Sequence, residues 1–199
     1  MHVRISVITG ATDIDGGIAI IRDQVVPQLS QQKGYGGLSA SGDRAAGLVS
    51  VLTVWESEAD LNASESVADK VRSDAVRVIG GDVSVERFEQ VVWERGDTPA
   101  GPGAKLHIRQ IKMDPSRIDE NVEFFRQVVL PEMKAAPGFI GCRNLINRST
   151  GEGRVGTVWT DEESLNRQLA DAEPRRARAA ERGVEFGADQ VLEVLFTAK

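Results

Sequence analysis

The stretch Arg22-Asp-Gln-Val-Val-Pro-Gln-Leu29, followed by Gly34-Tyr-Gly-Gly37, decides the fold because it occurs twice. It returns as Arg126-Gln-Val-Val-Leu-Pro-Glu-Met133 followed by Gly138-Phe-Ile-Gly141, at an offset of 104 residues. The same offset aligns Val51-Leu-Thr-Val-Trp-Glu-Ser-Glu58 with Val155-Gly-Thr-Val-Trp-Thr-Asp-Glu162. Agreement in one fixed register over this distance indicates an internal duplication.

A short segment rich in proline and glycine separates the two copies. It reads Gly96-Asp-Thr-Pro-Ala-Gly-Pro-Gly103 and has no apolar periodicity, which is typical of a linker. The sequence therefore predicts a first repeat over residues 1–95, a linker over 96–103 and a second repeat over 104–199.

Within each copy the apolar spacing changes in the same order. Alternation around residues 3–7 and 106–108 predicts a first strand, and helical spacing then predicts an amphipathic helix over 14–29 and 118–133. An interior proline removes a hydrogen bond from that helix, so we expect a kink at Pro27 and at Pro131. Two further strands, a second helix capped by Ser57 or Asp161, and a fourth strand complete a β-α-β-β-α-β unit.

That order is the ferredoxin-like split βαβ arrangement, an antiparallel sheet with both helices on one face. The other sheet face needs a cover, and the simplest cover is the sheet of the other copy. We therefore predict an α+β fold in which two ferredoxin-like repeats pack sheet to sheet as a pseudo-two-fold dimeric α+β barrel. The chain would be an intramolecular pseudo-dimer, a pattern that is compatible with further homo-oligomers.

The composition of the chain excludes several classes of protein. With 199 residues, 41% of them hydrophobic, and a net charge of −6 from 24 basic and 30 acidic side chains, it is an ordinary globular sequence. The charge argues against nucleic acid as a partner, and no apolar run is long enough to span a membrane. A single cysteine, Cys142, and an N-terminus that does not read as a signal peptide favour the cytoplasm.

The repeats also resemble a known family. Pro137-Gly-Phe139 after an amphipathic helix, a hairpin, and Trp55-Glu-Ser-Glu-Ala59 or Trp159-Thr-Asp-Glu-Glu163 look like the antibiotic biosynthesis monooxygenase domain of the dimeric α+β barrel superfamily. The resemblance covers nearly the whole chain, once per copy. Members include cofactor-independent oxygenases that act on phenolic or quinol-like substrates, and haem-degrading oxygenases.

The haem-degrading branch of this family uses an Asn on the first strand and a His in the helix after the tryptophan. Neither copy has these residues, so the resemblance implies that neither a haem cofactor nor a metal takes part. The cofactor-free branch needs an apolar pocket and polar groups that bind and deprotonate an electron-rich aromatic, whose anion then reacts with oxygen.

The second repeat carries more of these polar groups than the first. His107, Arg109, Asn144 and Trp159 align with Arg4, Ser6, Ala40 and Trp55, so only the tryptophan is shared. A histidine suits proton transfer near neutral pH, and an arginine or asparagine can stabilise a phenolate. We therefore assign His107, Arg109, Asn144 and Trp159 as candidate catalytic residues.

Each candidate also has a structural interpretation. The tryptophans could pack under the second helix, the arginines could lie in surface ion pairs, and His107 alternates opposite Leu106 and Ile108. Two functions follow. The first is a cofactor-independent monooxygenase for a small aromatic or quinol-like substrate, and the alternative is a non-catalytic barrel that binds a small molecule or has a structural role.

Overall fold

The computed structural model describes residues 1–199 without interruption. Each repeat follows the predicted β-α-β-β-α-β order, with both helices divided into shorter segments. The first repeat consists of β1 (His2–Thr9), α1 (Ile14–Ile20), η1 (Ile21–Val25), α2 (Val26–Leu29), β2 (Tyr35–Asp43), β3 (Leu48–Trp55), α3 (Glu58–Ala63), α4 (Glu65–Ile79) and β4 (Asp82–Arg95). The second consists of β5 (Lys105–Lys112), η2 (Pro115–Arg117), α5 (Ile118–Phe124), η3 (Phe125–Val129), α6 (Leu130–Ala135), β6 (Phe139–Ile146), β7 (Glu152–Trp159), α7 (Glu162–Ala170), α8 (Glu173–Ala180) and β8 (Glu185–Ala198).

The chain forms two compact units that share the two long strands β4 and β8. Unit 1 contains Met1–Phe88 and Glu193–Lys199, and unit 2 contains Glu89–Leu192. In unit 1, β3 pairs antiparallel with β1 and β2, and β2 pairs with the last residues of β8. In unit 2, β7 pairs antiparallel with β5 and β6, and β6 pairs with the last residues of β4.

The hydrogen-bonded order of all eight strands is closed and runs β1-β3-β2-β8-β5-β7-β6-β4. The predicted fold class is therefore confirmed: the chain is α+β, with two ferredoxin-like repeats whose strands form a closed antiparallel barrel. The division of the sequence into repeats at 1–95 and 104–199, with a linker at 96–103, stays a prediction. The compact units have different bounds, because each of the strands β4 and β8 is divided between the two units.

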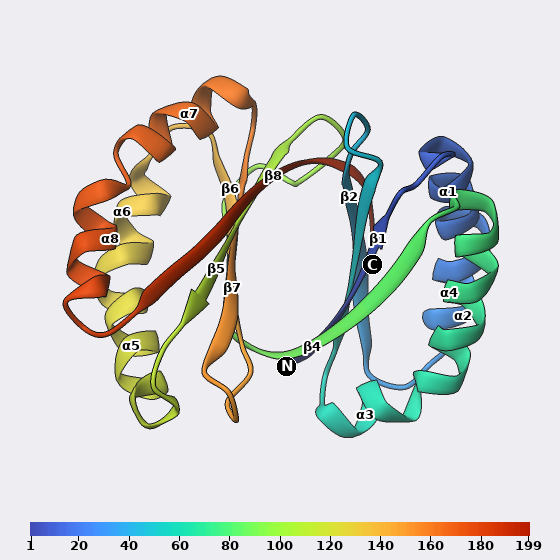
Figure 1. Ribbon diagram of the computed structural model, residues 1–199, viewed down its shortest axis with the longest axis horizontal. Coiled ribbons are helices and arrows are strands. Elements are labelled where there is room, and N and C mark those ends of the chain that lie inside the picture. The colour runs from blue at the N-terminus through green and yellow to red at the C-terminus, as the bar shows by residue number, and fades with distance from the viewer. The chain divides into compact units, whose positions relative to one another are not determined.

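In each unit the helices cover one face of the sheet and bury an apolar cluster against it (Figure 1). In unit 1, α1, α2 and α4 lie along strands β1 to β3, and in unit 2, α5, α6 and α8 lie along β5 to β7. Each cluster is centred on a tryptophan that is completely buried, Trp55 in unit 1 and Trp159 in unit 2. The sequence pattern therefore produces the same helix-on-sheet layer twice.

The first helix of each repeat contains a π-helical segment at the place where we expected a proline kink. The amide of Val26 donates to the carbonyl of Ile21, and that of Leu130 to the carbonyl of Phe125, in each case five residues back. Pro27 and Pro131 follow directly. A proline has no amide hydrogen and cannot donate the next helical hydrogen bond. The wider π-helical turn therefore ends next to a position where a helical hydrogen bond is already missing.

The predicted helix caps are confirmed. The Ser57 hydroxyl accepts a hydrogen bond from the amide of Asp60 at 3.0 Å, and the Asp161 carboxylate accepts one from the amide of Ser164 at 2.8 Å. A side-chain acceptor at this position satisfies one of the free amides of the first helical turn. Both caps hold the start of the second helix directly after the buried tryptophan.

Candidate functional site

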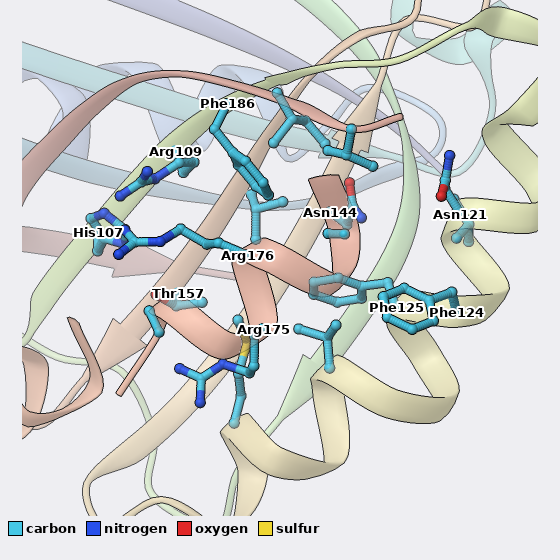
Figure 2. Close-up of a pocket in the computed structure, with 18 of the residues that line it drawn as sticks. His107, Arg109, Asn121, Phe124, Phe125, Asn144, Thr157, Arg175, Arg176 and Phe186 are labelled. Atoms are coloured by element: carbon cyan, nitrogen blue, oxygen red, sulfur yellow. The ribbon is translucent and has the colours of Figure 1, made fainter. Parts of the chain in front are cut away.

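Each unit has a cavity between its helices and its sheet. The unit 2 cavity has a volume of about 100 Å³ and is bounded by strands β5, β6 and β7 and by helices α5, α6 and α8 (Figure 2). The unit 1 cavity occupies the equivalent place and measures about 40 Å³. On this scale a single water needs about 10–15 Å³, so the unit 2 cavity has room for a small ring.

His107 and Arg109 line the unit 2 cavity from strand β5 (Figure 2). As the alternation predicts, they lie on the strand face opposite Leu106 and Ile108. This face is the one that the helices cover, and Ile111 continues it into the apolar cluster. Both polar residues share one partner from strand β8, because His107 Nε2 lies 2.9 Å from Asp189 Oδ1 and Arg109 donates to the other carboxylate oxygen.

The environment of His107 favours a neutral ring at neutral pH. The residue is 6% exposed, and burial lowers the pKa of His107, an effect that the hydrogen bond to Asp189 opposes and that the charges of Arg109 and Arg176 reinforce. A carboxylate accepts hydrogen bonds, so Nε2 carries the proton in this contact. The neutral ring then has its lone pair on Nδ1, and this nitrogen can take a proton.

Two asparagines on different walls of this cavity have buried polar atoms without a partner. Asn144 on β6 is 3% exposed and its Oδ1 makes no hydrogen bond, while Asn121 on α5 is 5% exposed and neither Oδ1 nor Nδ2 makes one (Figure 2). An unsatisfied buried polar group costs about 1–3 kcal/mol. These amides are therefore available to a polar group of a ligand.

The sequence analysis predicted Asn144 but missed Asn121. Asn121 lies on the inward face of its helix, three residues after Ile118 and four before Phe125, where the spacing calls for an apolar side chain. A polar residue at such a position is a signal of a satisfied network or of a site. The aligned residue of the first repeat is Gly17, so the difference between the copies also pointed to it.

Trp159, the fourth predicted residue, does not line the cavity. It is completely buried, its indole Nε1 donates to Thr157 Oγ1 at 3.0 Å, and its ring meets Phe139 edge to face at 5.7 Å between centroids. Trp55 makes the same contacts with Thr53 and Tyr35. The structure therefore brings His107, Arg109 and Asn144 to the cavity and places Trp159 beneath it, behind Thr157, which does line the cavity.

Arg175 on α8 is a further cavity residue that the sequence analysis did not single out. Burial lowers the pKa of Arg175, and its Nε has no partner although its Nη2 donates to Gln168. The first repeat has Val71 at this position. Compared with the aligned positions of unit 1, unit 2 therefore has additional polar side chains on both the strand wall and the helix wall of its cavity.

No group of three or more histidine, cysteine, aspartate or glutamate side chains is arranged to hold a metal ion. None of the helices is both long and apolar enough to cross a membrane.

The fold is that of ferredoxin-like proteins related to the antibiotic biosynthesis monooxygenases. A provisionally assigned monooxygenase from Lactobacillus acidophilus NCFM superposes with a TM-score of 0.73 at 11% identity, over 100% of this chain and 96% of that one. An anthrone oxidase-like protein gives 0.67 at 14% identity, over 99% and 92%. An uncharacterized ferredoxin-fold protein related to antibiotic biosynthesis monooxygenases, from Listeria monocytogenes 4b F2365, gives 0.54 at 10%, over 98% and 95%. The predicted family resemblance is thus confirmed at the level of the fold.

Sequence comparison identifies relatives in Mycobacterium tuberculosis. The uncharacterized protein Rv2558 of strain H37Rv is 30% identical in an alignment of 181 positions that covers 86% of this chain and 73% of the relative. The uncharacterized protein Rv2557 is 27% identical over 77% of this chain and 68% of its own length. No family profile matches the chain. The chain belongs to the family of Rv2558.

Proposed function

We propose that unit 2 is a cofactor-independent monooxygenase that acts on a small aromatic or quinol-like substrate. The observation that carries this proposal is a cavity in which a neutral histidine, oriented by a carboxylate, lies with two asparagines whose buried amide atoms include three without a hydrogen-bond partner. The proposal is also supported by the fold that this chain shares with a provisionally assigned monooxygenase and with an anthrone oxidase-like protein.

The proposed reaction begins with proton transfer from a substrate hydroxyl to His107 Nδ1. The resulting electron-rich anion donates an electron pair to dioxygen, a C–O bond forms at a ring carbon, and the hydroperoxide takes up a proton. Loss of the ring C–H proton with cleavage of the O–O bond gives a carbonyl and water. One substrate and one O₂ therefore yield one quinone-type product and one H₂O, with the substrate as the reductant.

The roles of the remaining residues follow from their contacts. Asp189 accepts the Nε2 proton of His107 and so keeps Nδ1 free, which is the task of an orienting carboxylate. Arg109 neutralises Asp189 and holds it in place. The amides of Asn144 and Asn121 offer a donor for the developing phenolate and an acceptor for a second hydroxyl.

The size of the cavity limits the substrate. An apolar cavity of about 150 Å³ binds benzene, so a volume of about 100 Å³ favours a single ring over a fused polycycle. Phe124 and Phe125 on the helix wall and Phe186 on β8 supply aromatic surface against which such a ring can pack. A net charge of −6 supports a small molecule rather than nucleic acid as ligand, and the single cysteine supports a cytoplasmic location.

The test is oxygen consumption by the full chain with a panel of single-ring hydroquinones in buffer treated to remove metals. Asn144→Ala and Arg109→Ala should lower turnover by about 10-fold or more, because the first removes a group that binds the developing anion and the second releases the carboxylate that orients His107. Ser39→Ala, which alters the residue aligned with Arg143 in the first repeat, is the control and should leave turnover unchanged.

Two other outcomes would count against the proposal. Saturable binding of the same hydroquinones without oxygen consumption would favour the non-catalytic small-molecule-binding barrel. Turnover that disappears on addition of a chelator would contradict independence from cofactors.

A further inference from the structure

The unit 1 cavity is built from positions that also line the unit 2 cavity, and its charged lining groups are two arginines. It measures about 40 Å³, and its polar lining consists of Arg4, Ser6, Thr53 and Arg72. The rest of the lining is aliphatic. On a scale of about 10–15 Å³ per water, this space holds a ligand the size of about three to four waters.

Arg4 is the central feature of this cavity. Its side chain is 3% exposed, and Nη2 donates to the Leu61 carbonyl at 2.7 Å and to Glu65 Oε2 at 2.8 Å. Nε and Nη1 are buried and have no partner, although the guanidinium lies over the Trp55 ring at 5.6 Å. A guanidinium stays charged in a protein, so these unused donors are a standing cost that an acceptor would remove.

The ion pairs around Arg4 leave positive charge in excess. Glu65 is shared by Arg4, Arg72 and Arg87, at 2.8, 3.3 and 2.7 Å, and Arg72 has a second partner in Asp69 at 2.9 Å. This group has three guanidiniums and two carboxylates. Although burial opposes it, the hydrogen bond from Arg87 and the charge of Arg4 lower the pKa of Glu65 to about 2, so the carboxylate cannot release its partners by protonation near neutral pH.

We propose that the unit 1 cavity binds a small monovalent anion, of the size of formate or nitrate, through the free Nε and Nη1 donors of Arg4. The hydroxyl of Ser6, which lies on the same strand face two residues along, can donate a further hydrogen bond to this anion. The aliphatic lining and the small volume select against larger carboxylates and divalent anions. This site is independent of the oxygenase chemistry proposed for unit 2.

The aligned positions on β5 and on α7 differ in unit 2. His107 stands in place of Arg4, Leu169 in place of Glu65, and Arg109 is already paired with Asp189. At the aligned position on the first strand, the same framework therefore places a neutral ring in one copy and a guanidinium with spare donors in the other.

The experiment titrates sodium formate and sodium nitrate separately into the full chain at constant ionic strength, balanced with sodium gluconate, whose anion is too large for the cavity. Calorimetry should show saturable binding of one anion per chain, and the unfolding temperature should rise with formate or nitrate but not with gluconate. Sodium benzoate serves as a second anion that is too large.

Ala75→Leu fills the unit 1 cavity while keeping the Arg4 side chain and should weaken binding at least tenfold, while Ala179→Leu, the matched change in unit 2, should leave it intact. Arg4→Met should abolish binding, and Ala75→Leu keeps the test decisive if Arg4→Met fails to fold. The proposal is overturned if neither anion binds saturably, if gluconate or benzoate binds as well, or if Ala75→Leu binds like the unaltered chain.

Discussion

The two cavities have a shared framework and different chemistry. Their apolar walls correspond position by position, with Val25 matched to Val129, Ala68 to Ala172 and Ala75 to Ala179. The residues that could meet a ligand differ, because Arg4 and Ser6 in unit 1 correspond to His107 and Arg109 in unit 2. The comparison shows that the duplicated layer keeps its packing fixed while the polar groups on β1 and β5 diverge.

The difference in volume has an equally local cause. In unit 1 the side chain of Ile79 fills the space next to Gly17, where an added Cβ would lie 2.1 Å from Ile79 Cγ1. In unit 2, Gly183 aligns with Ile79 and Asn121 aligns with Gly17. The larger side chain of the pair therefore lies at the end of the second helix in unit 1 and within the first helix in unit 2. This exchange widens the unit 2 cavity and narrows the unit 1 cavity.

The largest expected effect concerns proton transfer in unit 2. His107→Gln should reduce oxygen consumption with a hydroquinone substrate by about 10²- to 10⁴-fold, because it removes the general base. Ser6→Ala, at the unit 1 position aligned with Arg109, should change turnover by less than about twofold. Equal losses in both variants would contradict the assignment of the chemistry to one copy.

The second largest effect is expected from Ile79, the side chain that narrows the unit 1 cavity. Ile79→Ala should lower the free energy of unfolding by about 2–5 kcal/mol, since it removes a side chain that is 1% exposed and leaves a void. Val78→Ala, its exposed neighbour at 39%, should stay within about 0.5 kcal/mol. Urea denaturation measures both. A small loss for Ile79→Ala would mean that this region collapses around the void.

A smaller effect is expected at the aligned position that is Gly17 in unit 1 and Asn121 in unit 2. Gly17→Ala should destabilise by about 1–3 kcal/mol through its clash with Ile79, although alanine is usually the better helix residue. Asn121→Ala removes a buried amide without partners and should be neutral or stabilising in the absence of ligand. If Gly17→Ala stabilises the chain in urea denaturation, the proposed exchange of volume is wrong.

The smallest effect is a pH dependence that only unit 2 should show. Because the folded-state pKa of His107 lies below its ordinary value of 6.5, the unfolded chain takes up the proton first as the pH falls. The contribution of the neutral ring is complete above pH 6.5 and is lost below it, with a slope of at most about 1.4 kcal/mol per pH unit.

This slope is measured as the difference in unfolding free energy between the unaltered chain and His107→Gln at pH 7.5, 6.5 and 5.5. The two curves should run parallel above pH 6.5 and converge below it. Convergence on the alkaline side instead would show that the folded state binds the proton more tightly.

The features that could be predicted from the sequence are local or repeated. Apolar spacing places the helices and strands, and the caps at Ser57 and Asp161 follow from residues three positions apart. The duplication supplies the fold class, because it shows that one β-α-β-β-α-β pattern recurs. The asymmetry between copies also pointed to His107, Arg109 and Asn144, which the structure brings to one cavity.

The features that escaped prediction depend on contacts between distant residues. Asp189 meets His107 across 82 positions of sequence, and nothing in the local pattern of β8 marks it as a partner. The unused donors of Arg4 follow from burial beneath α4, which periodicity does not report. The sequence predicted a kink at Pro27 and Pro131, because each proline removes a helical hydrogen bond. The structure has a π-helical segment before each proline instead, and the local sequence does not distinguish these two outcomes.

The division of β4 and β8 between the two units bears on how the chain could be taken apart. A fragment of residues 1–95 would lack Glu193–Lys199, which complete unit 1, and a fragment of residues 104–199 would lack Glu89–Arg95, which pair with β6 in unit 2. Cleavage within 96–103 therefore leaves neither product whole. Two such fragments, produced separately, should restore the fold only on mixing, which makes this chain a natural starting point for a split-protein reporter.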